Sequence, residues 1–456
     1  MKPGTHQGRV DRRRRNRGTV LIVTMWVAVV LAGLALVFAQ AARVEAIAGA
    51  NQRATLQAEA VARGALQYVI QAVDGPAGRP DVLDNVTGEA RRVGQGYFYL
   101  LKPSLSGNGT YEYGLIDEAS RINLNTAASD MLLKLPGMTA ELADSILDWR
   151  DENADVSPNG AESEYYLLLD HPYYCKDAPL EAVEEMLLIR GASKAILYGE
   201  DTNRNGVLDP NENDGDAGEP DDNRDGSLDR GLLGYVTVYS AEPNLSADGQ
   251  PRVNVSSGGP ALAGLLREVI RDDSVFTILD NARRGRPFSS VLDFYFRSGL
   301  TKDQFALVAD RLTTSNADAL SGLVNVNTAP REVLLCLPEL GESDVDALIE
   351  HRTSPSVNLT SVAWVADVLP REKATAIGPY ITTRSYQFAA DIVAVSGDGR
   401  SFRRCRAVVD ARQSPPRVLR WQDLTHLGWP LDPEILAALR EGGSVGRANL
   451  TASLRR

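Results

Sequence analysis

The sequence predicts an α+β protein in which a long N-terminal helix and a small antiparallel sheet are interrupted by a large helical insertion. Three observations predict this class. An apolar run near the N-terminus continues into an amphipathic helical pattern, apolar segments flank tight turns at two places, and a segment in the middle of the chain recurs. With 456 residues, the chain can hold two or three domains beyond the helix.

The N-terminal helix is the longest element that the sequence predicts. Thr19–Ala42 contains no ionisable side chain, and about 20 apolar residues suffice to cross a bilayer. Apolar residues then recur at helical spacing until Asp74-Gly75-Pro76 supplies a turn. They are Val44, Ile47, Ala54, Ala58, Val61, Ala65, Val69 and Val73. A helix over 19–73 would be roughly 80 Å long, and a filament or another long partner explains such a rod best.

A basic cluster before this helix sets its orientation. Arg12–Arg15 and Arg17 should stay cytoplasmic by the positive-inside rule, which places the bulk of the chain across the membrane. Three interpretations remain open: a signal peptide cut near Ala39-Gln40-Ala41, a plain uncleaved anchor, or a short basic leader. In the third, Gly18 ends the leader and Thr19 is the mature N-terminus. The third is favoured, because the apolar run is long for a signal peptide and continues as helix.

Composition argues against several classes of function. Net charge is −12, and beyond residue 18 the chain carries 41 basic and 59 acidic residues, a net of −18. So acidic a surface repels phosphate backbones, so nucleic acid is not an expected partner. Three cysteines (Cys175, Cys336, Cys405) are too few for a disulfide framework, although a single disulfide between two of them is possible. Four histidines and no nucleophile elbow, zinc spacing or phosphate loop predict a protein that is not an enzyme.

Two hairpins are predicted from turn chemistry. Tyr97–Leu101 and Tyr111–Ile116 flank Ser106–Gly109, and later Asp391–Ser396 and Arg403–Ala411 flank Gly397-Asp398-Gly399. The two hairpins lie on either side of the helical middle of the chain. They therefore form one sheet that is split by the insertion.

The insertion contains a repeated segment. Arg121–Ala127 and Met131–Gly137 correspond to Val324–Pro330 and Val333–Pro338, and Val253–Ser257 resembles a third start. Each copy predicts an extended start, a Thr or Ser cap, a short helix, a tight turn and a second helix. This arrangement resembles a helix-hairpin-helix unit. The turn after Pro338 carries acidic residues where phosphate would approach, so a packing role is expected.

The N-terminal arrangement resembles that of type IV pilin-like proteins. Most of them have glutamate at the fifth mature position, where this chain has Val23. The family that characteristically lacks this glutamate is minor pseudopilin K of type II secretion systems. Asp117–Thr126 and Asp177–Gly191 resemble that family's helical domain, and Thr383–Phe388 resembles its return to the sheet.

The resemblance implies an organisation and a function. The expected parts are a prepilin leader (1–18), a transmembrane and amphipathic pilin helix (19–74), the first part of a pilin-like sheet (75–118), the helical insertion (119–380), and the sheet return and tail (381–456). The implied protein is a methylated, single-pass inner-membrane subunit with a periplasmic C-terminal domain. It would cap a pseudopilus tip, bound to other minor pseudopilins, membrane lipid and prepilin peptidase.

Two alternatives to this function stay open. One is a minor pilin of a type IV pilus or a DNA-uptake machine. The other is a secreted calcium-binding protein, which would require cleavage near Ala41.

Two acidic loops within 201–232 predict structural calcium. The first fits the twelve-residue calcium pattern at every ligand position, with Gly206 at the sharp turn. Its ligands would be Asp201, Asn203, Asn205, the Val207 carbonyl, Asp209 and Glu212. The second repeats nine positions, with Asp221, Asn223, Asp225, Ser227 and Asp229 as ligands. Position twelve there is Leu232, so the second loop must borrow a ligand; Asp214, Asp216 and Glu219 are the candidates.

Overall fold

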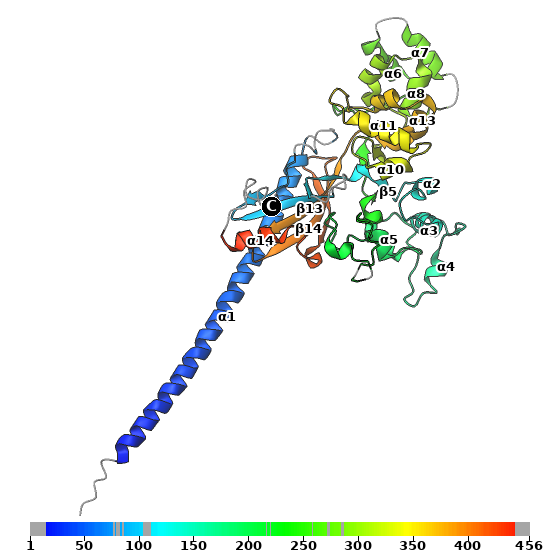
Figure 1. Cartoon of the computed structure of the whole chain (residues 1–456). Helices are drawn as coiled ribbons and strands as arrows, with labels where there is room; N and C mark the ends of the chain where they lie inside the picture. Colours follow the sequence, from blue (N-terminus) through cyan, green and yellow to red (C-terminus); the bar gives the residue numbers. More distant parts are fainter. Residues whose placement is uncertain are drawn as a thin grey trace, which may run out of the picture.

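The computed structural model confirms the α+β class: a rod-like helix carries a sheet and, beyond it, a large helical head (Figure 1). The structure describes residues 15–75, 78, 83, 86–103, 111–215, 217–218, 220–257, 259–270, 274–283 and 287–442. Helix α1 runs unbroken from Arg15 to Val73, 59 residues or about 90 Å. It therefore begins upstream of the predicted Thr19 and ends where the turn residues predict.

A seven-stranded sheet packs on the C-terminal half of α1. Its order is β1-β2-β13-β14-β15, with β3 beside β2 and β4 beside β13. The strands are β1 (Arg91–Val93), β2 (Gly96–Lys102), β3 (Glu112–Tyr113), β4 (Ile116–Asp117), β13 (Gln387–Val395), β14 (Phe402–Asp410) and β15 (Arg417–Asp423). Both predicted hairpins are confirmed: β13 pairs antiparallel with β14, and β2 with β3. The turn at 106–109 lies outside the described residues.

Both faces of the central strand β13 are covered, which explains why all nine of its residues are buried. Successive strand residues point to opposite faces. Phe388, Ala390 and Ile392 therefore meet α1, whereas Val393 and Val395 pack with helix α14 (Pro433–Arg440). Towards the sheet, α1 presents mostly small apolar side chains: Val61, Ala62, Ala65, Val69 and Val73.

Residues between β4 and β13 form three helical modules with one shared apolar core. Each module is closed by a two-stranded parallel ribbon, which the sequence did not reveal. Module 1 (122–237) is closed by β5 (Ile122–Asn123) and β6 (Val236–Thr237). Module 2 (253–313) is closed by β8 (Val253–Asn254) and β9 (Leu312–Thr313), and module 3 (324–382) by β11 (Val324–Asn325) and β12 (Ile381–Thr382). β7 (Ala241–Pro243) and β10 (Ala319–Ser321) form an antiparallel ribbon. In the sequence, β7 precedes module 2 and β10 follows it.

The helices of the modules are short. Module 1 contains α2 (Ser129–Leu132), α3 (Ala140–Arg150), α4 (Ser163–Tyr166) and α5 (Lys194–Tyr198); module 2 contains α6 (Pro260–Val269), α7 (Ser274–Arg283), α8 (Val291–Ser298) and α9 (Lys302–Val308); module 3 contains α10 (Arg331–Cys336), α11 (Glu342–Arg352), α12 (Val365–Val368) and α13 (Arg371–Ile377). The predicted Thr caps at the first helices are wrong. Helix α2 is capped by Ala128 and α10 by Pro330, neither with a side-chain hydrogen bond. The threonines instead lie in the turns after each first strand.

The sequence repeat has a common structural role at its asparagine. Asn123, Asn254 and Asn325 each accept a hydrogen bond from the backbone N–H two residues on, at 2.8–3.0 Å. Each side-chain amide also donates to the residues that follow its partner strand, Asn123 to Ser240, Asn254 to Thr314 and Asn325 to Ser385. The repeat therefore specifies the ribbon rather than a helix cap.

Candidate functional site

Helix α1 is covered by its own head over only half of its length. The first buried residue is Ala54, and every side chain from Thr19 to Ala48 is exposed. Within the described residues, α1 is the one helix long and apolar enough to cross a membrane. Val23 lies in this uncovered part and is 60% exposed. Gly18 and Thr19 continue α1 as regular helix.

A short stretch of mixed composition remains between the candidate membrane segment and the head. Ala42 and Ala54 are twelve positions apart in the helix, about 18 Å. Val44 and Ile47, which belong to the predicted helical pattern, are 63% and 47% exposed, and Leu56 is 59% exposed. These side chains are available to a partner from outside this chain.

The first calcium loop folds around its predicted ligands. Asp201, Asn205 and Glu212 are buried. Asn203 Nδ2 and Asn205 Nδ2 donate to the same Asp209 oxygen at 2.5 and 3.0 Å. Glu212 accepts from the N–H groups of Thr202 and Asp209 at 3.2 and 3.0 Å. All five side chains therefore converge on one place.

The chemistry of this loop fits a hard cation. Its ligand set is all oxygen, as calcium prefers. Burial raises the pKa of Asp201 to about 6 and, together with the neighbouring Asp201 and Asp209 carboxylates, raises the pKa of Glu212 to about 7. Ionised carboxylates in such a place need positive charge beside them. A bound calcium ion would supply that charge and hold the loop ordered.

The second loop has the same backbone as the first. Arg204 and Arg224, both at position four, have φ of 56°, and Gly206 and Gly226, both at position six, have φ of 74° and 75°. Asn223 and Asp225 accept backbone hydrogen bonds from the residues two further on, as Asn203 and Asn205 do in the first loop. The predicted ligands Asp221, Asn223, Asp225, Ser227 and Asp229 are exposed.

Glu200 occupies the place of the missing twelfth ligand. Its two oxygens accept from the N–H groups of Asn223 and Asp229 at 3.4 and 3.2 Å, much as Glu212 does in the first loop. Sequence reasoning missed Glu200, because it precedes both loops and matches no spacing rule. Among the predicted candidates, Asp214 Oδ1 is buried without a hydrogen-bond partner, whereas Asp216 and Glu219 lie outside the described residues.

The loops are fixed to the sheet by one arginine. Arg404 in β14 is fully buried and forms a bidentate ion pair with Asp391, at 3.0 and 2.7 Å. The same guanidinium donates to the carbonyls of Asn203 and Arg204 in the first loop. The loop conformation is therefore coupled to the centre of the sheet.

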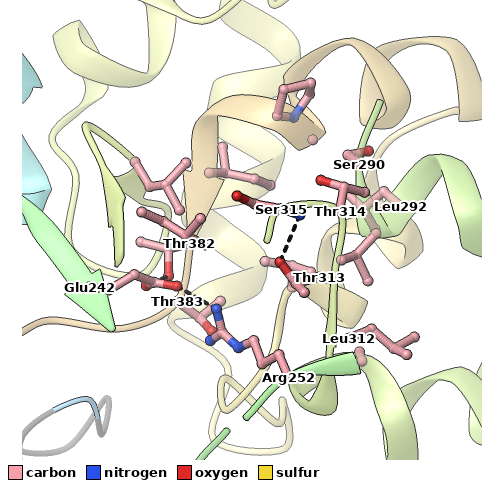
Figure 2. Close-up of a pocket in the computed structure, with 18 of the residues that line it drawn as sticks. Glu242, Arg252, Ser290, Leu292, Leu312, Thr313, Thr314, Ser315, Thr382 and Thr383 are labelled. Atoms are coloured by element: carbon pink, nitrogen blue, oxygen red, sulfur yellow. Dashed lines mark hydrogen bonds and ion pairs between the residues drawn. The ribbon is translucent and has the colours of Figure 1, made fainter. Parts of the chain in front are cut away.

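A cavity of about 420 Å³ lies between modules 2 and 3 (Figure 2). Serine and threonine hydroxyl groups share its wall with aliphatic side chains, and the ion pair of Arg252 and Glu242, at 2.6 Å, lies at one side. Thr382 also donates to Glu242 at 2.5 Å. Glu242 therefore links Arg252, which directly precedes module 2, to Thr382 in the last strand of module 3.

The two helical hairpins of the repeat share their turn geometry. Gly137 and Glu339 follow the prolines of the two turns and have φ of 70° and 59°. Glu339 and Glu342 are exposed at the second turn, where their charges oppose the approach of a phosphate.

The three cysteines are free and buried.

Comparisons with known proteins give a family match and a structural similarity. A family model described as "Type II secretion system (T2SS), protein K" matches residues 116–198, from β4 to the end of α5. This match confirms the resemblance of Asp117–Thr126 and Asp177–Gly191. A search of the curated proteins finds no match. Among solved structures, the chain is similar to one from the GspK-GspI-GspJ complex of the enterotoxigenic Escherichia coli Type 2 Secretion System, with 13% identity, a TM-score of 0.41, and coverage of 84% of this chain and 98% of that one.

Proposed function

We propose, from the match of residues 116–198 to the type II secretion protein K family, that the chain is a minor pseudopilin at the tip of a secretion pseudopilus. The observation that supports this function best is the unbroken helix α1, anchored by its C-terminal half and uncovered over its apolar N-terminal half. Its role is assembly rather than catalysis. The chain is a single-pass protein of the inner membrane with its head in the periplasm.

The uncovered part of α1 next to the head is where other minor pseudopilins bind. Val44 and Ile47 are exposed on the part of α1 that the head leaves bare, and Leu56 is exposed where the head begins to cover the helix. Helices of partner subunits would cover these side chains and remove them from water. The bulky head at the other end of α1 suits the last subunit of a filament, because it would obstruct a further subunit stacked above it (Figure 1).

Processing by prepilin peptidase gives the first prediction. Cleavage should fall between Gly18 and Thr19, so mass spectrometry of chain co-expressed with the peptidase should find a mature N-terminus at Thr19, methylated on its amine. Gly18→Val should leave the leader attached. Gly33→Val is the matched control, because Gly33 lies in the same helix and a Cβ there would meet nothing within 4 Å. If both the wild type and the control began near Ala42 in their mature forms, the proposed function would be wrong.

We also propose that the loops of 201–232 bind structural calcium. Their shared backbone, their all-oxygen ligand sets and the position of Glu200 support this proposal. A long loop of this kind rarely stays compact without such help. Calcium would therefore order a segment of module 1 that rests on the sheet through Arg404.

Calcium removal gives the second prediction. A chelator should lower the melting temperature of the full chain and expose 201–232 to protease. A ligand present at 100 times its Kd stabilises by about 2.7 kcal/mol. Glu212→Gln and Glu200→Gln should each reduce the calcium bound per chain. Glu181→Gln is the control, because the Glu181 side chain is 86% exposed outside the loops. Equal protease protection with and without calcium would contradict the proposal.

A further inference from the structure

A second cluster of metal-ligating side chains lies in module 1, away from the calcium loops. Glu162, Cys175 and Asp177 each bring one donor atom to the same place, and these three atoms lie within 4.8 Å of one another. Glu162 is the residue that precedes α4, and Cys175 and Asp177 come from the loop that returns past it. The cluster therefore joins two segments that are separate in the sequence.

The Glu162 carboxylate has an unsatisfied oxygen. Its side chain is in a residue only 4% exposed, and Oε1 is buried without a hydrogen-bond partner. A buried polar atom without a partner costs about 1–3 kcal/mol, and more for a charged group. Because Glu162 also contributes one of the three clustered donor atoms, this buried and incompletely satisfied carboxylate points to a ligand at the cluster.

The charged groups that act on Glu162 are acidic. Burial raises the pKa of Glu162, and so do the carboxylates of Asp148, Asp177 and Asp151, whereas a hydrogen bond with Cys175 lowers it. Asp148 is fully buried, and its two oxygens accept from the N–H of Ser157 at 3.2 and 3.1 Å. Nearby Lys176 is turned to Glu185, at 2.8 Å. A cation would relieve this repulsion.

The donor types select among cations. Calcium takes oxygen ligands only, whereas zinc takes thiolate sulfur together with carboxylate oxygen. In a tetrahedral zinc site, with Zn–S of about 2.3 Å and Zn–O of about 2.0–2.2 Å, a sulfur and an oxygen ligand lie about 3.6 Å apart. Donors already within 4.8 Å reach that spacing by small rotations of their side chains.

We propose that Glu162, Cys175 and Asp177 form a zinc site that fastens the start of α4 to the 175–177 loop. On binding, the Cys175 thiol releases its proton to solvent and the sulfur forms a bond to zinc. The Glu162 and Asp177 carboxylates bind as anions, and water fills the fourth position. The thiol now lies 3.7 Å from the Asp148 carbonyl oxygen, its acceptor when protonated.

The test measures zinc bound to the full chain in detergent, in excess calcium so that the loops of 201–232 do not compete. Gel-filtered wild-type chain should carry one zinc per chain. Cys175→Ser should lower the zinc affinity at least tenfold, and so should Glu162→Gln. Cys336→Ser is the matched control, because Cys336 is another free, buried cysteine in a helical module, and it should bind as the wild type does.

A second measurement needs no variant. Zinc should slow alkylation of Cys175 in the wild-type chain at least tenfold, while the rates of Cys336 and Cys405, mapped in the same digest, stay unchanged. The inference is overturned if Cys175→Ser binds zinc as tightly as the wild type, or if only calcium binds and the alkylation of Cys175 does not change. Either outcome leaves the proposed pseudopilin function intact, because that function rests on α1.

Discussion

Arg404→Ala should destabilise the protein by about 3–5 kcal/mol, the usual cost of removing one partner of a buried ion pair. The variant would leave the carboxylate of Asp391 buried and uncompensated at the centre of the sheet. It would also remove both donors to the carbonyls of Asn203 and Arg204. Calcium affinity of the first loop should therefore fall together with stability.

Denaturant unfolding of the full chain, with and without calcium, measures both effects. Arg400→Ala is the matched control. Arg400 lies just before β14 and pairs with Asp398 at 3.4 Å, but both side chains are about half exposed. Exposed pairs contribute about 0–1 kcal/mol. If Arg404→Ala changed stability no more than Arg400→Ala does, the guanidinium would not couple the loop to the sheet.

Asp117→Ala should cost more than about 3 kcal/mol, because several buried donors lose their acceptor at once. Asp117 ends β4 and is 2% exposed. One of its oxygens accepts from Asn325 Nδ2 at 2.9 Å, Thr328 Oγ1 at 2.5 Å and Ser385 Oγ at 2.6 Å. The other accepts from the Ala119 N–H at 2.8 Å. Asp117 thereby ties the sheet to Asn325 in the first strand of the module 3 ribbon and to Ser385, which follows the second strand.

Asp117→Asn keeps the shape of the side chain and removes its charge, so it distinguishes the two contributions to stability. The two hydroxyl groups can turn to donate elsewhere or to accept from an amide, so the asparagine should lose less stability than the alanine. Asp346→Ala is the surface control, with a side chain 61% exposed and paired to Arg331. Thermal melts of the four proteins should rank wild type and Asp346→Ala highest and Asp117→Ala lowest. A melt of Asp117→Ala equal to that of the control would exclude the role of Asp117 as a junction.

Local signals in the sequence were sufficient to predict much of the fold. Continuous helical periodicity to Val73 predicted α1, and turn chemistry at Gly397-Asp398-Gly399 predicted the β13–β14 hairpin. Ligand spacing predicted which side chains gather at Asp209. In each case the partners are close in the sequence, so spacing determines which side chains face one another.

The remaining features depend on residues that are far apart. Ser385 and Asp117 are 268 positions apart, and no periodicity links them. The closing ribbons have only two residues a strand, too few to show alternation. Glu200 looks like the end of a helix, and its part in the second loop emerges only when the loop folds back on it. The free Cys175 gave no spacing signal either, because its neighbours Glu162 and Asp177 reach it through tertiary packing.

The pairing of β4 with β13 also bears on how such a chain could have arisen. Asp117 and Phe388 are direct partners in antiparallel strands, so the three modules leave the sheet and return to it at a single point. A short turn joining these two strands would turn them into an ordinary hairpin and leave the sheet order unchanged. The head is thus an insertion at one hairpin turn, and a smaller chain with α1, the sheet and α14 would keep both faces of β13 covered.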